Sequence, residues 1–287
     1  MPRSISFIGV GNMGARMARR LIAAGHTVRV CDPSDAGRAA FQAIGCTVTT
    51  KALDCTEDEI IILMVADATQ IIDVVTGAHG LDKRLPTGKP PVILIMSTVL
   101  PTTCLELQAR IGRDRARFVD APVSGGLFAA QQGTLTIMAG GVAGDIDAVF
   151  PVLEIMGNPV HRCGSLGAGE ILKIINNIMG ITNIYGAAEA FLLAAKNGIS
   201  IETLAPVVET CSGRNFFTKN ADKTRSNYQS WAATPEVFAS LGDIIRKDLS
   251  LAHQLAEASG LHLPVLEGVR SAVASTPDDI RRDWLTL

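Results

Sequence analysis

The sequence is poor in charged and aromatic side chains and has no excess of one sign. Charged residues make up 19% of the 287 residues and aromatic residues 5%, and 26 Lys and Arg nearly balance 28 Asp and Glu for a net charge of −2. Such a protein has no long-range field that would draw it to nucleic acid or to anionic lipid. The composition therefore excludes a basic nucleic-acid-binding protein and favours a small-molecule partner.

Cysteine pairs with redox or metal-type spacing are absent, and we expect no N-terminal leader. The six cysteines are scattered with no C-x-x-C pair, which predicts reduced thiols in a cytoplasmic protein without disulfides or a metal site. Gly9 and Arg16 interrupt the apolar run that a signal peptide requires. Residues 171–195 are apolar and long enough to span a membrane, but Lys173 and Glu189 interrupt them. We therefore expect a long buried helix and no membrane partner.

Hydrophobic residues make up 47% of the sequence, and their pattern changes after about residue 163. Before that point, short β-branched runs alternate with helical patterns, which is typical of a parallel sheet covered by helices on both faces. Afterwards, helical periods dominate. We predict an α/β dinucleotide-binding domain over residues 1–163 and an all-α domain over 164–287, joined by a long interdomain helix. The apolar helical half also predicts a subunit interface, so we expect a homodimer or homotetramer. The candidate strands are residues 5–8, 27–30, 60–65, 92–96, 117–119 and 134–138.

A glycine-rich turn follows the first candidate strand. Residues 9–14 read Gly-Val-Gly-Asn-Met-Gly and open an apolar helical pattern that ends at Gly25. This arrangement brings the backbone close to a pyrophosphate and directs a helix N-terminus at the anion. The alternative is a structural turn without a ligand. The cofactor-binding residues predicted in this turn are Gly9, Gly11, Asn12, Met13 and Gly14.

The choice of nicotinamide cofactor depends on the end of the second candidate strand. Asp32 lies there, where a carboxylate accepts bonds from the ribose hydroxyls and repels a 2′-phosphate. We therefore predict NAD. Arg38 is close enough in sequence to reach a phosphate, which leaves NADP possible, and a simple turn role of Asp32 before Pro33 is the other alternative.

Two further stretches contain polar groups that suggest a binding or catalytic role. Ser124, Gly125 and Gly126 follow a strand-like run, and their backbone N–H groups and hydroxyl can converge on a small anion such as a carboxylate. Lys173 and Asn177 are four residues apart, so they share one face of an otherwise apolar helix. Burying a charge there is costly unless the charge is paired or has a function. The alternatives are a structural turn at the first stretch and, at the second, a lysine that reaches solvent beside an asparagine satisfied in the core.

These stretches, together with Lys247-Asp248-Leu249 on a late helix, resemble the β-hydroxyacid dehydrogenase family in order and separation across essentially the whole chain. The resemblance implies a Rossmann domain, a long interdomain helix and an all-helical C-terminal domain. It also implies that NAD or NADP oxidises the hydroxyl of a small β-hydroxy acid, such as 3-hydroxyisobutyrate, or reduces the corresponding semialdehyde.

The resemblance assigns roles residue by residue. Residues 65–67 depart from the family, since they read Val-Ala-Asp where Leu-Pro or Val-Pro is commoner. The implied roles are catalytic for Lys173, substrate-orienting for Asn177, substrate-carboxylate binding for Ser124, Gly125 and Gly126, cofactor binding for Val65, Ala66 and Thr98, and cofactor binding near the nicotinamide for Lys247, which Asp248 fixes.

The mechanistic hypothesis is that Lys173 acts as general base in oxidation and as general acid in reduction. A free lysine has a pKa of about 10.4, so the reaction needs a lowering of about 2–3 units, which burial among apolar neighbours such as Ile174 and Ile175 can supply. Three alternatives stay open. Ser240 and Asp243 resemble threonate-type polyhydroxy acid dehydrogenases. An imine reductase or a catalytically silent dinucleotide-binding interaction module is also possible, although Lys173 argues against both.

Overall fold

The structure is a computed structural model that describes residues 2–275 and 277–287. Its internal contacts divide the chain into two compact units, Met1–Lys173 and Ile174–Leu287. The division falls inside one continuous helix, α7 (Ala168–Lys196). The domain boundary predicted after residue 163 stays a prediction.

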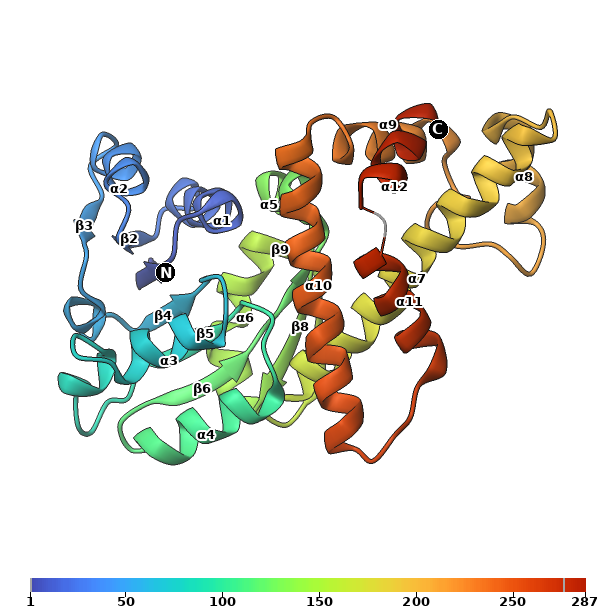
Figure 1. The fold of residues 1–287 in the computed structure, drawn as a ribbon. Coiled ribbons are helices and arrows are strands. Elements are labelled where there is room, and N and C mark those ends of the chain that lie inside the picture. Colours follow the sequence, from blue (N-terminus) through green and yellow to red (C-terminus); the bar gives the residue numbers. More distant parts are fainter. Residues whose placement is uncertain (1, 276) are drawn as a thin grey trace. The chain divides into compact units, whose positions relative to one another are not determined.

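The first unit alternates strands and helices as predicted (Figure 1). Two strands, β3 and β9, have few apolar residues and carry no signal that sequence patterning detects. The strands are β1 (Ser4–Ile8), β2 (Thr27–Cys31), β3 (Thr47–Thr49), β4 (Ile60–Leu63), β5 (Val92–Ile95), β6 (Arg117–Asp120), β7 (Val123–Ser124), β8 (Leu135–Gly141) and β9 (Gly157–Gly164). The helices are α1 (Asn12–Ala23), α2 (Asp35–Gln42), η1 (Ala52–Cys55), α3 (Ala68–Thr76), η2 (Leu81–Lys83), α4 (Pro101–Ile111), α5 (Gly126–Gln132) and α6 (Ala143–Met156).

All nine strands form one sheet, in the order β3-β2-β1-β4-β5-β6-β8-β7, with β9 beside β8. The strands from β3 to β6 are parallel, which confirms the predicted parallel sheet, whereas β8 runs antiparallel to β6 and β7. Strand order reverses direction at β1, because β2 and β3 lie on one side of it and β4 to β6 on the other. In α/β sheets a ligand binds at this switch point, beyond the carboxyl ends of the strands.

The sheet is buried on both faces. Along β1 and β4, Ile5, Phe7 and Ile62 join a core with α1, α5 and α6, while Ile61 and Leu63 join a second core with α3 and α4 (Figure 1). This alternation follows from the two-residue period of a strand. Near-continuous apolar strands therefore identify the covered parallel sheet correctly.

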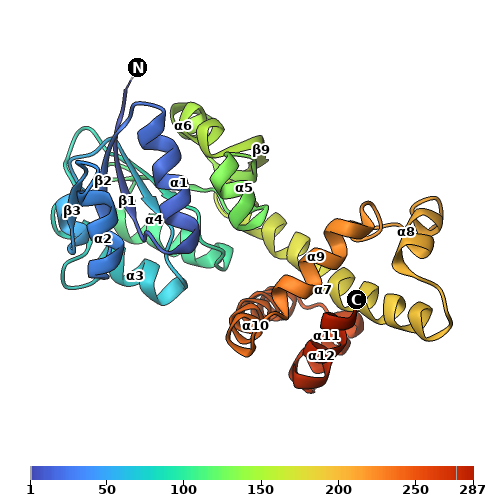
Figure 2. The same ribbon diagram turned by 90° about the horizontal axis from the view of Figure 1, so that it is seen from above.

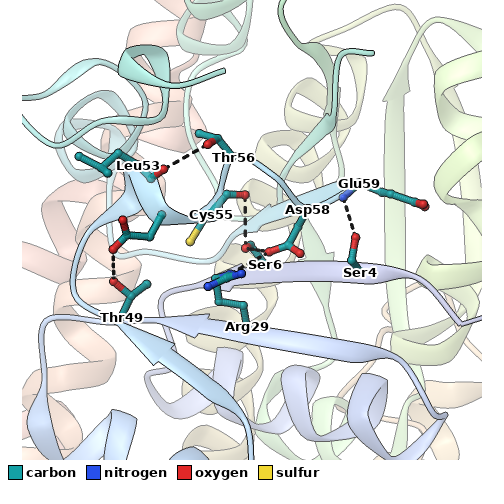
Figure 3. Close-up of polar contacts among 10 residues, drawn as sticks. Ser4, Ser6, Arg29, Thr49, Leu53, Cys55, Thr56, Asp58 and Glu59 are labelled. Atoms are coloured by element: carbon teal, nitrogen blue, oxygen red, sulfur yellow. Dashed lines mark hydrogen bonds and ion pairs between the residues drawn. The ribbon is translucent and has the colours of Figure 1, made fainter. Parts of the chain in front are cut away.

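A buried polar network fixes β1, β2 and the segment before β4 to one another (Figure 3). Ser6 on β1 donates to the Asp58 carboxylate at 2.6 Å, and Arg29 on β2 donates to the same carboxylate at 3.1 Å. Ser6 is completely buried, so each of these bonds replaces one to water that burial removed. The network therefore fixes the position of β2, and Asp32 directly follows the end of that strand.

The second unit is entirely helical among its described residues (Figure 2). Six aromatic side chains from five segments pack against one another in its core, mostly edge to face, with the Tyr228 and Trp284 ring centroids 5.0 Å apart. After α7 its helices are α8 (Ile201–Glu209), α9 (Ala221–Trp231), α10 (Pro235–Ala258), α11 (Pro264–Ser275) and α12 (Pro277–Thr286). The packed rings are Tyr185, Phe217, Tyr228, Trp231, Phe238 and Trp284.

Helix α7 corrects one expectation. The sequence predicts a long buried helix, but one third of its most apolar window is buried, and Leu172, Ile175, Met179 and Leu193 are exposed. A single stripe of a helix contacts its neighbours, and apolar residues occur all round α7, so composition alone cannot tell the covered stripe from the open one. In the described part of the chain, α7 is also the one helix long and apolar enough to cross a membrane. The core helices of many globular proteins have the same length and composition.

Candidate functional site

The carboxyl ends of the parallel strands bring several predicted residues to one edge of the sheet. Gly9 follows β1, Asp32 follows β2, Val65 lies just beyond β4 and Ser97 just beyond β5, and Asp120 ends β6. Parallel strands end at the same edge, so segments far apart in sequence meet there. Every cofactor-binding residue predicted from the sequence except Lys247 therefore lies in the first unit.

The glycine turn is held tightly against the sheet. Gly9 has a φ of +93°, and a methyl group there would collide with the Met64 carbonyl at the end of β4. A methyl group at Gly14 would collide with the Gly9 carbonyl. Both positions therefore require glycine, the first also because side chains disfavour a positive φ. Gly11 differs, because it is exposed and no described atom lies within 4 Å of the position its Cβ would take.

The N-terminus of α1 is open and fits an anionic ligand. The capping residue is Gly11, which has no side-chain acceptor, and the first turn, from Asn12 through Met13 and Gly14, carries no acidic residue. Backbone N–H groups at a helix N-terminus need partners and create a partial positive charge. The loop therefore leaves both space and donors for the pyrophosphate of a dinucleotide.

Asp32 is held firmly in the position predicted for it. Its side chain is 9% exposed and accepts hydrogen bonds from the Val10 N–H at 2.7 Å and the Ser34 N–H at 2.8 Å. Arg38 donates to the Asp32 carbonyl oxygen at 2.5 Å and forms an ion pair with Asp35. Arg38 is the residue that kept NADP as an alternative cofactor in the sequence analysis. Its guanidinium is therefore already paired with a carboxylate.

The loops after β4 and β5 are joined by one hydroxyl. Ser97 Oγ accepts a hydrogen bond from the Val65 N–H at 2.9 Å and donates to the Val65 carbonyl at 2.7 Å. Asp67, in the segment that departs from the family pattern, caps α3 by accepting the Gln70 N–H at 2.9 Å. The Gln70 side chain in turn accepts the Ala66 N–H at 3.0 Å. These bonds fix the backbone of the predicted cofactor loops.

The glycine run after β6 turns the chain sharply. Gly125 has a φ of +136° and Gly126 a φ of +72°, values that favour glycine. Ser124 is half-buried, and both glycines are exposed. The predicted carboxylate-binding groups therefore remain accessible to a small ligand.

Lys173 is the one lysine among the buried polar residues of the described chain, with 9% of its surface exposed. It lies in the second turn of α7, and two buried carboxylates that the sequence did not assign make hydrogen bonds at the start of that helix. Asp120 accepts the Gly167 N–H at 2.7 Å and the Glu170 N–H at 2.8 Å. Glu170 accepts the Val99 N–H at 3.1 Å. The low exposure of Lys173 agrees with the prediction that its side chain is withdrawn from water.

Burial changes the pKa of the Asp120 carboxyl. Removal from water raises the pKa of the Asp120 carboxyl, because the charged form loses its hydration, and the N–H groups of Gly167, Glu170 and Gly169 oppose that rise. Burial likewise raises the pKa of the neighbouring Cys104 thiol, and the carboxylates of Glu170 and Asp120 add to the effect. The start of α7 is thus a dry region with acidic groups.

The remaining predicted residues lie together in the second unit. Asn177 on α7 donates to one oxygen of Asp248 at 2.9 Å, and the Lys247 ammonium lies 3.1 Å from the other oxygen. Asp248 therefore orients both of the polar groups that the resemblance singles out. Within residues 2–275 and 277–287, no group of three or more His, Cys, Asp or Glu side chains could hold a metal ion.

Two protein-family models match the chain. The model described as the NAD binding domain of 6-phosphogluconate dehydrogenase matches residues 4–167. The model described as the NAD-binding domain of NADP-dependent 3-hydroxyisobutyrate dehydrogenase matches residues 167–284. The two models together span both units.

Individual relatives extend this likeness. The mitochondrial 3-hydroxyisobutyrate dehydrogenase of Drosophila melanogaster is 33% identical over 266 residues, which cover 92% of this chain and 81% of that protein. The NAD-dependent L-serine dehydrogenase of Pseudomonas aeruginosa is 30% identical over 265 residues, with coverage of 92% and 88%. The solved structure of Mycobacterium tuberculosis 3-hydroxyisobutyrate dehydrogenase with L-serine has a TM-score of 0.84 and 27% identity. It covers 100% of this chain and 99% of that one.

Proposed function

Because the chain belongs to the β-hydroxyacid dehydrogenase family, whose members are NAD(P)-dependent oxidoreductases, we propose that it oxidises a 3-hydroxyisobutyrate-like acid with Lys173 as proton acceptor. The observation that carries this proposal is the buried position of Lys173. It lies on the helix whose start is bonded to the loop beyond Ser97.

Lys173 is the group that can move the proton. A lysine accepts a proton only as a neutral amine, and withdrawal from water favours the neutral form of an amine. In oxidation Lys173 takes the proton of the substrate hydroxyl, and in reduction it returns one to the carbonyl oxygen. The bound nicotinamide supplies the hydride acceptor.

The other predicted residues bind and orient the substrate. Ser124, Gly125 and Gly126 offer one hydroxyl and accessible backbone N–H groups to the substrate carboxylate. Asn177, held by Asp248 at 2.9 Å, orients the substrate as the family resemblance implies. Lys247, which Asp248 also holds, acts at the cofactor. Asp248 fixes Asn177 and Lys247 relative to each other, which lowers the entropic cost of aligning these two groups.

We propose NAD as the preferred cofactor. The Asp32 carboxylate is fixed by two backbone N–H groups, so it is positioned to accept bonds from a free ribose diol and to repel a 2′-phosphate. Arg38, the residue that could neutralise such a phosphate, is paired with Asp35.

L-serine is a second candidate substrate, because it carries a β-hydroxyl and a carboxylate and because a 30% identical relative is an L-serine dehydrogenase. Threonate is a third. Asp243, part of the signal for it, is exposed and binds Arg246 at 2.6 Å, which weakens that reading.

A substrate panel tests the proposal. Purified protein is assayed at 340 nm with 3-hydroxyisobutyrate, L-serine and threonate, each with NAD and with NADP. The expected result is the highest kcat/KM for 3-hydroxyisobutyrate with NAD, at least about tenfold above NADP because a repelled phosphate costs several kcal/mol. Absence of activity with every pair, despite tight NADH binding, would leave a dinucleotide-binding interaction module.

We propose that the protein assembles in the cytoplasm as a homodimer or homotetramer, and the exposed apolar side chains of α7 support self-association. Leu172, Ile175, Met179 and Leu193 are exposed apolar side chains on one face of α7, and exposed apolar side chains gathered on one face are typical of an interface. Met179→Lys is expected to shift the mass measured by light scattering towards the monomer, whereas Leu261→Lys, at an exposed leucine outside α7, leaves it unchanged. An unaltered mass for the Met179 variant would contradict this interface.

A further inference from the structure

We infer that Asp120 and Glu170 are positioning residues that together set the place of Lys173 relative to the cofactor loop at residues 97–99. This inference rests on the proposed roles of Lys173 and of that loop. It concerns two completely buried carboxylates. Asp120, at the end of β6, binds the start of α7, and Glu170, in the first turn of α7, binds the loop after β5.

Asp120 fixes the start of α7. One carboxylate oxygen accepts the Gly167 N–H and the other accepts the Glu170 N–H, at 2.7 and 2.8 Å. A pair of bonds to different residues of one turn fixes both the rotation of the helix and its position along its axis. Lys173 lies one turn beyond Glu170, so its side chain follows that placement.

The surroundings of Asp120 leave no freedom for another arrangement. A methyl group at Gly140 on β8 would lie 2.5 Å from one Asp120 oxygen, and a methyl group at Gly169 would lie 2.8 Å from the other. Two glycines therefore admit the carboxylate between β8 and α7. The partial positive charge of the helix N-terminus compensates the burial of the anion.

Glu170 connects the same turn to the cofactor loop. Its carboxylate accepts the Val99 N–H at 3.1 Å, and Val99 directly follows Ser97 and Thr98. Ser97 in turn bonds the backbone of Val65 at both its N–H and its carbonyl. A chain of short bonds thus runs from the end of β4, through the loop after β5, to the helix turn that precedes Lys173.

The design of the variants separates bonding from charge. Glu170→Leu removes the acceptor for Val99, and Glu170→Met serves as a second variant if the leucine protein folds poorly. Glu170→Gln keeps an acceptor oxygen but loses the charge. A displacement of about 1 Å in a catalytic group costs about 100-fold in rate. The Leu or Met variant is therefore expected to lose about that factor in kcat and the Gln variant less than about threefold.

Amide hydrogen exchange provides a readout independent of catalysis. The Leu or Met variant is expected to exchange faster both at residues 97–104 and at residues 167–173, because one side chain connects them. Asp120→Asn, whose amide NH₂ cannot accept from an N–H, is expected to speed exchange at residues 167–173 and to lower kcat at least about tenfold. NADH affinity is measured alongside each variant.

Asp145→Asn is the matched control. Asp145 is a buried carboxylate of the same unit that binds Arg113 at 2.6 Å and Arg117 at 3.4 Å. Its loss is expected to lower stability but to leave kcat and exchange at both segments unchanged. Faster exchange in only one segment after the Glu170 change, or a Gln variant as impaired as the Leu variant, would overturn the inference. If the wild-type protein oxidises no hydroxy acid, the proposed function fails, and the exchange data still decide the inference.

Discussion

Two helices of this protein begin in opposite electrostatic situations. Helix α1 starts at Gly11, which is exposed and has no described side chain as a cap. Helix α7 starts over the completely buried Asp120, which accepts two of its N–H groups. Since both termini carry the same partial positive charge, the difference lies in where the anion comes from.

The comparison shows how one physical property serves two purposes. At α1 the chain supplies no anion, so the donors remain available to an external one. At α7 the chain supplies its own anion, Asp120. The N–H donors are therefore already bonded, and the helix that carries Lys173 is fixed in position. An acidic cap added to α1 should therefore weaken cofactor binding, whereas loss of the acidic cap of α7 should displace Lys173.

The largest effect is expected when α1 is given a cap like that of α7. Gly11 has a φ of −64° and open space at its Cβ position, so Gly11→Asp fits without strain and caps the helix. The new carboxylate repels the cofactor pyrophosphate, and like charges in contact cost several kcal/mol, so the Kd for NADH should rise at least about 100-fold. Calorimetric titration measures the Kd.

The control for this change is Gly144→Asp. Gly144 lies in the first turn of α6, is exposed, and also has no described atom within 4 Å of its Cβ position. It should leave NADH binding unaltered. Equal binding by the Gly11 variant and the wild-type protein would show that the open terminus is not the pyrophosphate site.

A smaller effect is expected at the other end of the nucleotide site. Asp32→Ser removes the acceptor for the ribose diol, and a hydrogen bond to a charged group is worth about 1.5–3 kcal/mol, so KM for NAD should rise about 10- to 100-fold. The KM for NADP should change less, because the repulsion disappears as well. Steady-state kinetics with both cofactors measures the ratio, and an unchanged preference for NAD would exclude Asp32 as its cause.

The smallest effect is a pH dependence of stability from Asp120. Burial raises its pKa above the ordinary value of 3.8, so its contribution is complete below about pH 3.8 and is lost as pH rises through the folded value. The free energy of unfolding of the wild-type protein relative to Asp120→Asn should therefore fall as the pH rises above about 3.8. Urea unfolding at several pH values measures it, and a difference that rises with pH would contradict the sign.

Sequence patterning predicted the parts of the fold that local rules determine. The run of buried strands, the glycine turn and the helix ending at Gly25, whose φ is +86°, follow from the periods of strands and helices and from the steric demands of glycine. The exposed face of α7 could not be predicted. The helix has apolar residues on all sides, and the segments that pack against it are distant in sequence.

The same limit applies to the candidate site. Lys173, Asp32 and the glycine run stood out because their residue types are unusual where they lie. The cap of α7 by Asp120 did not, since 47 residues separate Asp120 from Gly167, and no spacing rule connects them. A buried acid at the end of a strand, beside a glycine-rich helix start, is the signal that could have suggested it.

The central claim is that Lys173 transfers the proton, and single-turnover oxidation by Lys173→Ala tests it most directly. The rate of NADH formation should fall by about 10²- to 10⁴-fold, the usual contribution of a general base, while the Kd for NADH stays within about twofold because the cofactor contacts lie elsewhere. Lys196→Ala, at an exposed lysine at the end of the same helix, should match the wild-type rate. A near-normal rate for the Lys173 variant would contradict the account.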